Sequence, residues 1–173
     1  RKLCTEWGKD LGLEVEVRNG EVVFADALAH PVLAVVADGL GGHPSGDVAS
    51  RIAVQAMLDA KPDDARSLVE AVHYANEEVV AAMSAADGSI GMGSTVVAVL
   101  IREDGLAVAN VGDSPAFEIV DGRLVQLTTD DVAGASPGLP GIPSSVLTQS
   151  LGGGARLQEV DVHLYEDELP PPR

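Results

Sequence analysis

The chain has 173 residues, a length that predicts one domain with its own hydrophobic core, over residues 1–173. Its 11 Lys and Arg against 27 Asp and Glu give a formal net charge of −16. That charge disfavours nucleic acid and anionic membranes as partners and favours multivalent cations. The single cysteine, Cys4, cannot form an internal disulfide. With no signal peptide or membrane-length apolar run visible, we expect a cytoplasmic protein.

The N-terminal part of the sequence predicts a hairpin and then a buried strand. Residues 13–17 alternate apolar and charged side chains, and Asn19-Gly20 is a strong hairpin signal, so residues 22–25 are expected to return as a second strand. Residues 32–37 are all apolar, which is typical of a strand buried on both faces.

Two helices are predicted to follow. The first opens at Pro44 and stops at Lys61-Pro62, and Asp63 or Asp64 caps the second, which ends at Asp87-Gly88. Apolar residues recur at helical spacing along the second helix: Leu68, Val72, Ala75, Val79 and Met83. Two helices between groups of strands indicate a helical layer packed on a sheet, an α+β fold.

The second half of the chain predicts an antiparallel meander, because its strands are joined by only a few residues. Residues 130–155 are rich in Gly, Pro and Ser and are predicted to form a loop or flap. Strands are expected at residues 95–101, 106–111, 116–120, 124–127 and 157–165. Asp121-Gly122, between the strands 116–120 and 124–127, is a second hairpin signal.

Two buried strands each end in a carboxylate beside glycine. Asp38 precedes Gly39 after the apolar run 32–37, and Asp113 follows Gly112. Carboxylates delivered to strand ends need partners, and glycine lets a backbone carbonyl approach a cation as well. The sequence therefore suggests an acidic pocket for hard cations with oxygen ligands. The plainer interpretation of Asp38 is that it caps the helix that follows.

Other chemistries find no support in the sequence. The four histidines lack the spacing of a zinc site, no phosphate-binding Gly-rich loop with Lys is present, and no serine has a nucleophile-elbow setting.

Five ordered motifs resemble the metal-dependent Ser/Thr protein phosphatases of the protein phosphatase 2C type, in their bacterial single-domain branch. The motifs are Ala37–His43 with Gly46 and Ala49-Ser50, Gly91–Thr95, Val111–Phe117, Leu127–Asp131 and Leu147–Gly152. The resemblance implies an α-β-β-α sandwich of two antiparallel sheets flanked by helices. It also implies two Mn²⁺ or Mg²⁺ ions, with a possible third, and hydrolysis of phosphoserine and phosphothreonine in proteins by a metal-activated water. Such an enzyme is expected to oppose bacterial Ser/Thr kinases.

The resemblance also implies roles for individual residues. Asp38 would bridge two metal ions, Gly39 would supply its carbonyl oxygen, and Asp87 would hold the third ion. Asp113 and His43 would lie close to the metals without binding them directly. In the N-terminal block, Arg18 would grip phosphate and Glu21 would contact metal.

The sequence departs from this pattern in three places. Gly20 stands where the family has Glu, and Pro115 replaces an Arg. The later Asp-Gly-Leu and Asp-Asn metal motifs of the family are absent from the chain, which predicts weakened metal binding and an incomplete sandwich prone to self-association. The alternative functional interpretation is a catalytically inactive phosphatase-like module that binds a partner. A purely structural α/β domain with acidic turns is a third interpretation.

Overall fold

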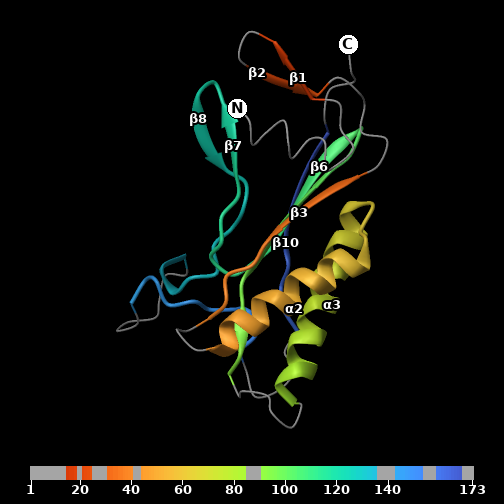
Figure 1. Cartoon of the computed structure of the whole chain (residues 1–173). Helices are drawn as coiled ribbons and strands as arrows, with labels where there is room; N and C mark the ends of the chain where they lie inside the picture. Colours follow the sequence, from red (N-terminus) through yellow and green to blue (C-terminus); the bar gives the residue numbers. More distant parts are fainter. Residues whose placement is uncertain are drawn as a thin grey trace.

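The computed structural model describes residues 15–18, 21–24, 31–40, 44–84, 91–135, 143–153 and 159–168. Two helices and a set of antiparallel strands account for the regular structure of these residues (Figure 1). The helices are α2 (Pro44–Ala60) and α3 (Ala65–Ser84), with a short 3₁₀ turn at Ala133–Ala135. The strands are β1 (Val15–Arg18), β2 (Glu21–Phe24), β3 (Val32–Val36), β4 (Gly93–Ser94), β5 (Val96–Ile101), β6 (Gly105–Val111), β7 (Phe117–Val120), β8 (Arg123–Gln126), β9 (Leu151–Gly152) and β10 (His163–Glu168).

The central sheet has four antiparallel strands in the order β10-β6-β5-β3. Val97 of β5 pairs with Val36 of β3 on one side and with Asn110 of β6 on the other, and His163 of β10 pairs with Asn110. The C-terminal ends of β3 and β6 therefore lie at the same edge of the sheet as the N-terminal ends of β5 and β10. Every candidate residue that follows or precedes one of these ends is brought to that edge.

Helices α2 and α3 pack side by side against one face of this sheet (Figure 1). The apolar stripe predicted for the second helix is confirmed, since four of its five residues are buried in the core and Met83 packs against it. Alternate residues of β5 and β6, such as Ala98 and Ala109, face the same core. The fully buried side chains of the helices include Ala49, Ala53, Met57, Leu68, Val72, Ala75 and Val79.

The prediction that residues 32–37 form a strand buried on both faces is wrong. Leu33 and Val35 pack against the helical core, but Ala34 is exposed and Val36 is 62% exposed. In the described part of the chain β3 pairs only with β5, so it is an edge strand with one covered face. A run of apolar residues without polar alternation does not distinguish this arrangement from a central strand.

Both predicted hairpins form. β1 pairs with β2 from Val15↔Phe24 to Arg18↔Glu21, which leaves a loop of two residues. β7 pairs with β8, and Asp121 and Gly122 between them have φ of 49° and 75°, as a type I′ turn requires. The β7–β8 hairpin extends away from the helices (Figure 1) and exposes apolar side chains such as Ile119 and Leu124.

The flap predicted at residues 130–155 is largely loop, since its described residues contain only the 3₁₀ turn and the two-residue strand β9. The last strand begins later than expected, at His163 rather than residue 157. The Asp161 N–H and carbonyl are both bonded to the Gln149 side chain, at 2.9 and 2.6 Å. These groups are therefore not part of the ladder with β6, which starts at the pair His163↔Asn110.

The start of α3 confirms Asp64 as the helix cap. The Ser67 N–H donates to Asp64 Oδ1 at 2.6 Å, and the Asp64 N–H donates in return to Ser67 Oγ at 3.0 Å. These bonds satisfy a helix N–H that has no partner within the helix. The bond from the Ser67 N–H, followed by that from its hydroxyl, lowers the pKa of the Asp64 carboxyl from 3.8.

We expect the contribution of Asp64 to stability to depend on pH. Because the pKa of Asp64 is lower in the folded chain, its stabilising effect is present above the unfolded value near pH 4 and is lost as pH falls through the folded value. The difference in melting temperature between the wild type and Asp64→Ala should thus be full at pH 7 and shrink in acid. Thermal unfolding followed by circular dichroism across this range would measure it, with Glu78→Ala, at an exposed position of the same helix, as the control. A constant difference would contradict the prediction.

Two leucines on the helices offer a matched test of the core. Leu68 of α3 is fully buried, whereas Leu58 of α2 is 47% exposed. Leu68→Ala should lower the free energy of unfolding by about 2–5 kcal/mol because it removes buried methyl groups and leaves a cavity. Leu58→Ala should change it by no more than about 1 kcal/mol. Urea denaturation gives both values, and similar losses in the two variants would show that the helical layer is not packed as described.

Candidate functional site at one edge of the sheet

Asp38 leaves the end of β3 tied to the start of β5 by its backbone. Its N–H donates to Thr95 Oγ1 at 3.1 Å, while its carbonyl accepts from the Thr95 N–H at 2.9 Å and from Ser94 Oγ at 3.1 Å. The carboxylate itself is exposed and accepts no hydrogen bond from the described residues. The backbone of Asp38 is thus held firmly while its carboxylate stays available for a ligand.

The glycines after Asp38 allow the chain to cross the start of α2. A side chain on Gly46 would place its Cβ 2.7 Å from the Leu40 carbonyl oxygen and 3.0 Å from the Gly39 carbonyl carbon. Gly39 also forms an isolated bridge with Ser94, and the Leu40 N–H donates to the Gly93 carbonyl at 2.8 Å. The close approach of the two backbones explains glycine at positions 39 and 46.

The second predicted carboxylate, Asp113, follows β6 at the same edge and is exposed. The hydroxyl of its neighbour Ser114 lies 2.7 Å from Thr95 Oγ1, the atom that also accepts the Asp38 N–H. Thr95 therefore connects the turn after β6 to the segment after β3. Asp38 and Asp113 thus lie at the same edge of the sheet, while the acidic pocket predicted for them stays a prediction.

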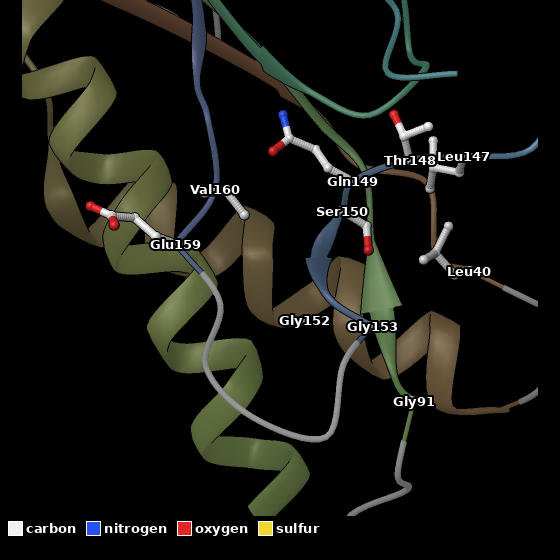
Figure 2. A pocket seen from close by; sticks show the side chains of 10 residues that line it. All are labelled: Leu40, Gly91, Leu147, Thr148, Gln149, Ser150, Gly152, Gly153, Glu159 and Val160. Carbon is white, nitrogen blue, oxygen red and sulfur yellow. The ribbon is translucent and has the colours of Figure 1, made fainter. Parts of the chain in front are cut away.

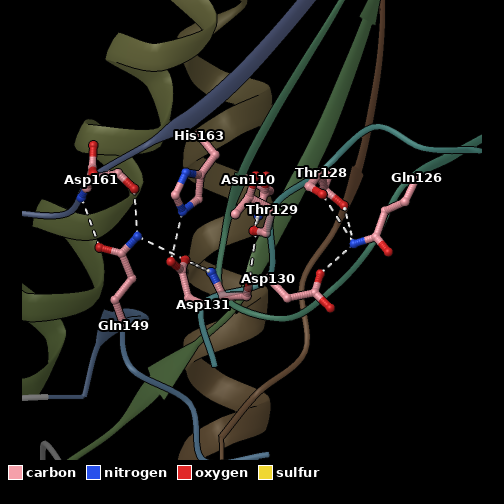
Figure 3. Close-up of polar contacts among 10 residues, drawn as sticks. Asn110, Gln126, Thr128, Thr129, Asp130, Asp131, Gln149, Asp161 and His163 are labelled. Atoms are coloured by element: carbon pink, nitrogen blue, oxygen red, sulfur yellow. Dashed lines mark hydrogen bonds and ion pairs between the residues drawn. The ribbon is translucent and has the colours of Figure 1, made fainter. Parts of the chain in front are cut away.

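Beside this turn, three side chains from distant parts of the chain converge on one another (Figure 3). Asp131 Oδ2 accepts from the Gly112 N–H at 2.7 Å and from Gln149 Nε2 at 2.9 Å, and Asp131 Oδ1 lies 2.8 Å from His163 Nε2. A carboxylate only accepts, so the imidazole is the donor in this last contact. The Asp131 side chain is 12% exposed. We refer to Asp131, Gln149 and His163 as the Asp131 cluster.

A pocket of about 370 Å³ lies next to these elements (Figure 2). It is lined by Leu40, by Thr148, Gln149 and Ser150 of the predicted flap, and by Glu159. Figure 2 shows Leu40 and Leu147 facing the same space, whereas the carboxylate of Glu159 points away from the other labelled residues. Gln149 therefore both lines the pocket and bonds Asp131.

The side chains of four predicted site residues lie outside the part of the chain that the structure describes. Arg18 and Glu21 are a backbone pair in the β1–β2 hairpin, but their side chains lie outside the described part of the structure. His43 and Asp87 lie outside the described residues altogether. Among the residues that are described, no group of three or more Asp, Glu, His or Cys is placed to hold a metal ion. Asp38, Gly39 and Asp113 are thus the predicted site residues that the structure brings to one edge.

The sequence analysis assigned no site role to the residues that hold this edge together. Thr95, Ser114, Asp131 and Gln149 all fall inside the motifs that carried the resemblance, so a motif-based search could have flagged them. His163 lies outside those motifs, and its contact to Asp131 joins residues 32 positions apart. Neither α2 nor α3, the long helices of the described part, has an apolar stretch that could cross a membrane.

The sequence matches the Protein phosphatase 2C family over residues 21–137, more than half of the chain. The chain belongs to this family. It is 34% identical over 127 residues to the Ser/Thr protein phosphatase PstP of Mycobacterium tuberculosis, covering 70% of this chain and 24% of PstP. It is also 34% identical over 117 residues to the Ser/Thr phosphatase stp of Listeria monocytogenes, covering 62% and 46% of the two chains. This protein phosphatase 2C chain thus spans less than half of these curated relatives.

Solved phosphatases share its fold. The catalytic domain of PstP in complex with two manganese ions superposes with a TM-score of 0.67 at 26% identity, covering 91% of this chain and 71% of that domain. The phosphatase MsPP of Mycobacterium smegmatis, in complex with cacodylate, gives 0.61 at 31% identity, covering 80% and 64%. The expected α+β architecture of the family is confirmed, for the part of the fold that the chain covers.

The close contact of Gly46 with Gly39 and Leu40 predicts that a Gly→Ala substitution here lowers stability, opposite to its usual effect in a helix. In most helix positions Gly→Ala stabilises, by up to about 1 kcal/mol. Gly46→Ala should instead destabilise, by about 1–3 kcal/mol, because the new methyl group meets backbone atoms that cannot move aside cheaply. Ser45→Ala, on the same helical turn, should be close to neutral. Urea denaturation of the two variants is the measurement, and a stabilised Gly46→Ala would rule out the close crossing.

Proposed function

We propose that this chain forms part of a Mn²⁺- or Mg²⁺-dependent phosphatase that hydrolyses phosphoserine and phosphothreonine in proteins. Its membership of the Protein phosphatase 2C family and its likeness to PstP, a Ser/Thr protein phosphatase solved with two manganese ions, support this proposal. The observation that carries it is Asp38, an exposed carboxylate on a firmly bonded backbone at the sheet edge where Asp113 also lies.

The donor atoms at this edge suit a hard cation. Mn²⁺ and Mg²⁺ prefer carboxylate and carbonyl oxygens, which Asp38 and Gly39 supply. These two residues are too few for a complete coordination shell, and the described residues contain no three-residue cluster. We therefore assign further ligands to Glu21 and Asp87, whose side chains lie outside the described part, with Asp87 at a third ion. Asp113 and His43 are assigned to the surroundings of the metals.

Bound ions would supply a water of lowered pKa and a clamp for the phosphate oxygens. The residues of the chain would position the ions and bind the phosphate. The Asp38 carboxylate would hold the ions, the bonds from Thr95 and Ser94 would keep its backbone in place, and Arg18 would bind the phosphate. With a net charge of −16, the protein repels a phosphorylated substrate, so local positive charge at the site is required for binding.

The physiological substrates proposed here are phosphoproteins made by bacterial Ser/Thr kinases, because the relatives above are bacterial Ser/Thr phosphatases. A catalytically inactive, phosphopeptide-binding module is the second candidate, favoured by the absence of a three-ligand cluster among the described residues. Self-association through exposed apolar surface stays a prediction.

Hydrolysis of p-nitrophenyl phosphate by this chain tests the proposal. Activity should require Mn²⁺, disappear with EDTA, and fall at least about a hundredfold in Asp38→Asn, because the amide loses the negative charge that holds the metal. Asp104→Asn is the matched control, since Asp104 lies in the β5–β6 turn at the opposite end of the sheet.

Two outcomes would contradict the proposed enzymatic function. Mn²⁺-independent activity, or full activity in Asp38→Asn, would place the chemistry elsewhere. Absence of turnover combined with binding of a phosphoserine peptide, seen by calorimetry and lost in Asp38→Asn, would favour the inactive module instead.

A further inference from the structure

The Asp131 carboxylate accepts hydrogen bonds from three groups, the Gly112 N–H, Gln149 Nε2 and His163 Nε2. Figure 3 shows the side chains of Gln149 and His163 directed at it. Its neighbour Asp130 differs: within the described part of the chain, its carboxylate bonds only the Gln126 side chain, at 2.7 Å, on the side of the β7–β8 hairpin. Two adjacent acidic residues thus face different parts of the molecule.

Asp131 makes two hydrogen bonds to the backbone of Gly112. Asp131 accepts the Gly112 N–H through its side chain and donates its own N–H to the Gly112 carbonyl at 3.1 Å. Gly112 has φ of 101°, which strongly favours glycine, and a Cβ there would lie 2.7 Å from Thr95 Cγ2. Asp131 therefore bonds both the N–H and the carbonyl of Gly112, at the point where the chain leaves β6.

A continuous set of bonds leads from this turn to Asp38. Ser114, two residues after Gly112, has its hydroxyl 2.7 Å from Thr95 Oγ1. Thr95 Oγ1 accepts the Asp38 N–H at 3.1 Å, and the Thr95 N–H donates to the Asp38 carbonyl. The direction in which the chain leaves β6 thus sets where Ser114 meets Thr95, and Thr95 sets the backbone of Asp38.

We propose that Asp131 is a positioning residue that orients Asp38 through Gly112, Ser114 and Thr95, with Gln149 and His163 holding its carboxylate in place. The effect of this arrangement on catalysis rests on the function proposed above, but its effect on the backbone of Asp38 does not. Asp131 itself bonds protein groups with both oxygens, so it acts through other residues and needs no contact with substrate.

Asp131→Asn removes the negative charge and one acceptor oxygen of the carboxylate with little change in the shape of the side chain. An NH₂ group in place of Oδ2 would face two donors, the Gly112 N–H and Gln149 Nε2. An NH₂ group in place of Oδ1 would reverse the contact with His163, whose Nε2 would then have to accept. His163→Leu removes one donor, whereas His163→Gln restores an N–H donor near the position of Nε2. Asp130→Asn is the matched control because its carboxylate lies outside the cluster.

Amide NMR spectra of the isotope-labelled full chain are the first measurement. In Asp131→Asn and His163→Leu, the amide signals of Gly112, Ser114 and Asp38 should all shift, and in His163→Gln they should return toward the wild type. Asp130→Asn should leave the Asp38 signal unchanged. A shift confined to Gly112, with Asp38 unmoved, would overturn the proposal whether or not the chain is an enzyme.

The second measurement separates positioning from stability. By electron paramagnetic resonance, Mn²⁺ affinity should fall about tenfold or more in Asp131→Asn. In Leu68→Ala, a core variant far from the edge, affinity should be unchanged below its melting temperature. Equal affinity of Asp131→Asn and wild type would leave Asp131 a purely structural residue and contradict the proposal. If the wild-type chain binds no Mn²⁺, the proposed function fails while the NMR result still decides the role of Asp131.

Discussion

The pairing of β5 with β3 and β6 is the constraint on which the candidate site depends. Because β5 runs antiparallel to both neighbours, their C-terminal ends lie on either side of its start. Thr95, just before β5, therefore stands between Asp38 and Ser114 and bonds both. The helical layer makes this register costly to change. A shift of one residue would turn Ala98 and Leu100 away from α2 and α3 and expose the apolar surface that they bury.

Local patterns predicted the local elements well, and their success has a physical basis. The stripe of α3, the Asp64 cap and the Asp121-Gly122 turn each depend on residues within a few positions of one another. Properties set by distant partners were predicted less well. An apolar sequence such as that of β3 suits a central or an edge strand equally. Its pairing, with β5 alone among the described strands, shows that β3 is at the edge. The last strand was predicted to begin too early. Asp161 bonds the side chain of Gln149, twelve positions away, and a contact with so distant a residue could not be predicted from the local pattern.

The same distinction applies to the site. Asp38, Gly39 and Asp113 could be proposed from the sequence because glycine beside a carboxylate at a strand end is a local pattern. The residues that hold them were not found, since the Asp131 cluster joins three segments whose contacts span 18 to 32 positions. Motif resemblance marked Asp131 and Gln149 as part of two blocks, but it gave no reason to connect those blocks to each other or to His163.

The carboxylates at this edge of the sheet also differ in how their charge is balanced. Asp131 is 12% exposed and receives three hydrogen bonds, so both of its oxygens already bond protein groups. The carboxylates of Asp38 and Asp113 are exposed and receive none from the described residues. In a chain with net charge −16, two such groups at one edge favour a cation over an anion as ligand. The fold thus uses the Asp131 carboxylate to hold this edge of the sheet together and leaves the carboxylates of Asp38 and Asp113 exposed there.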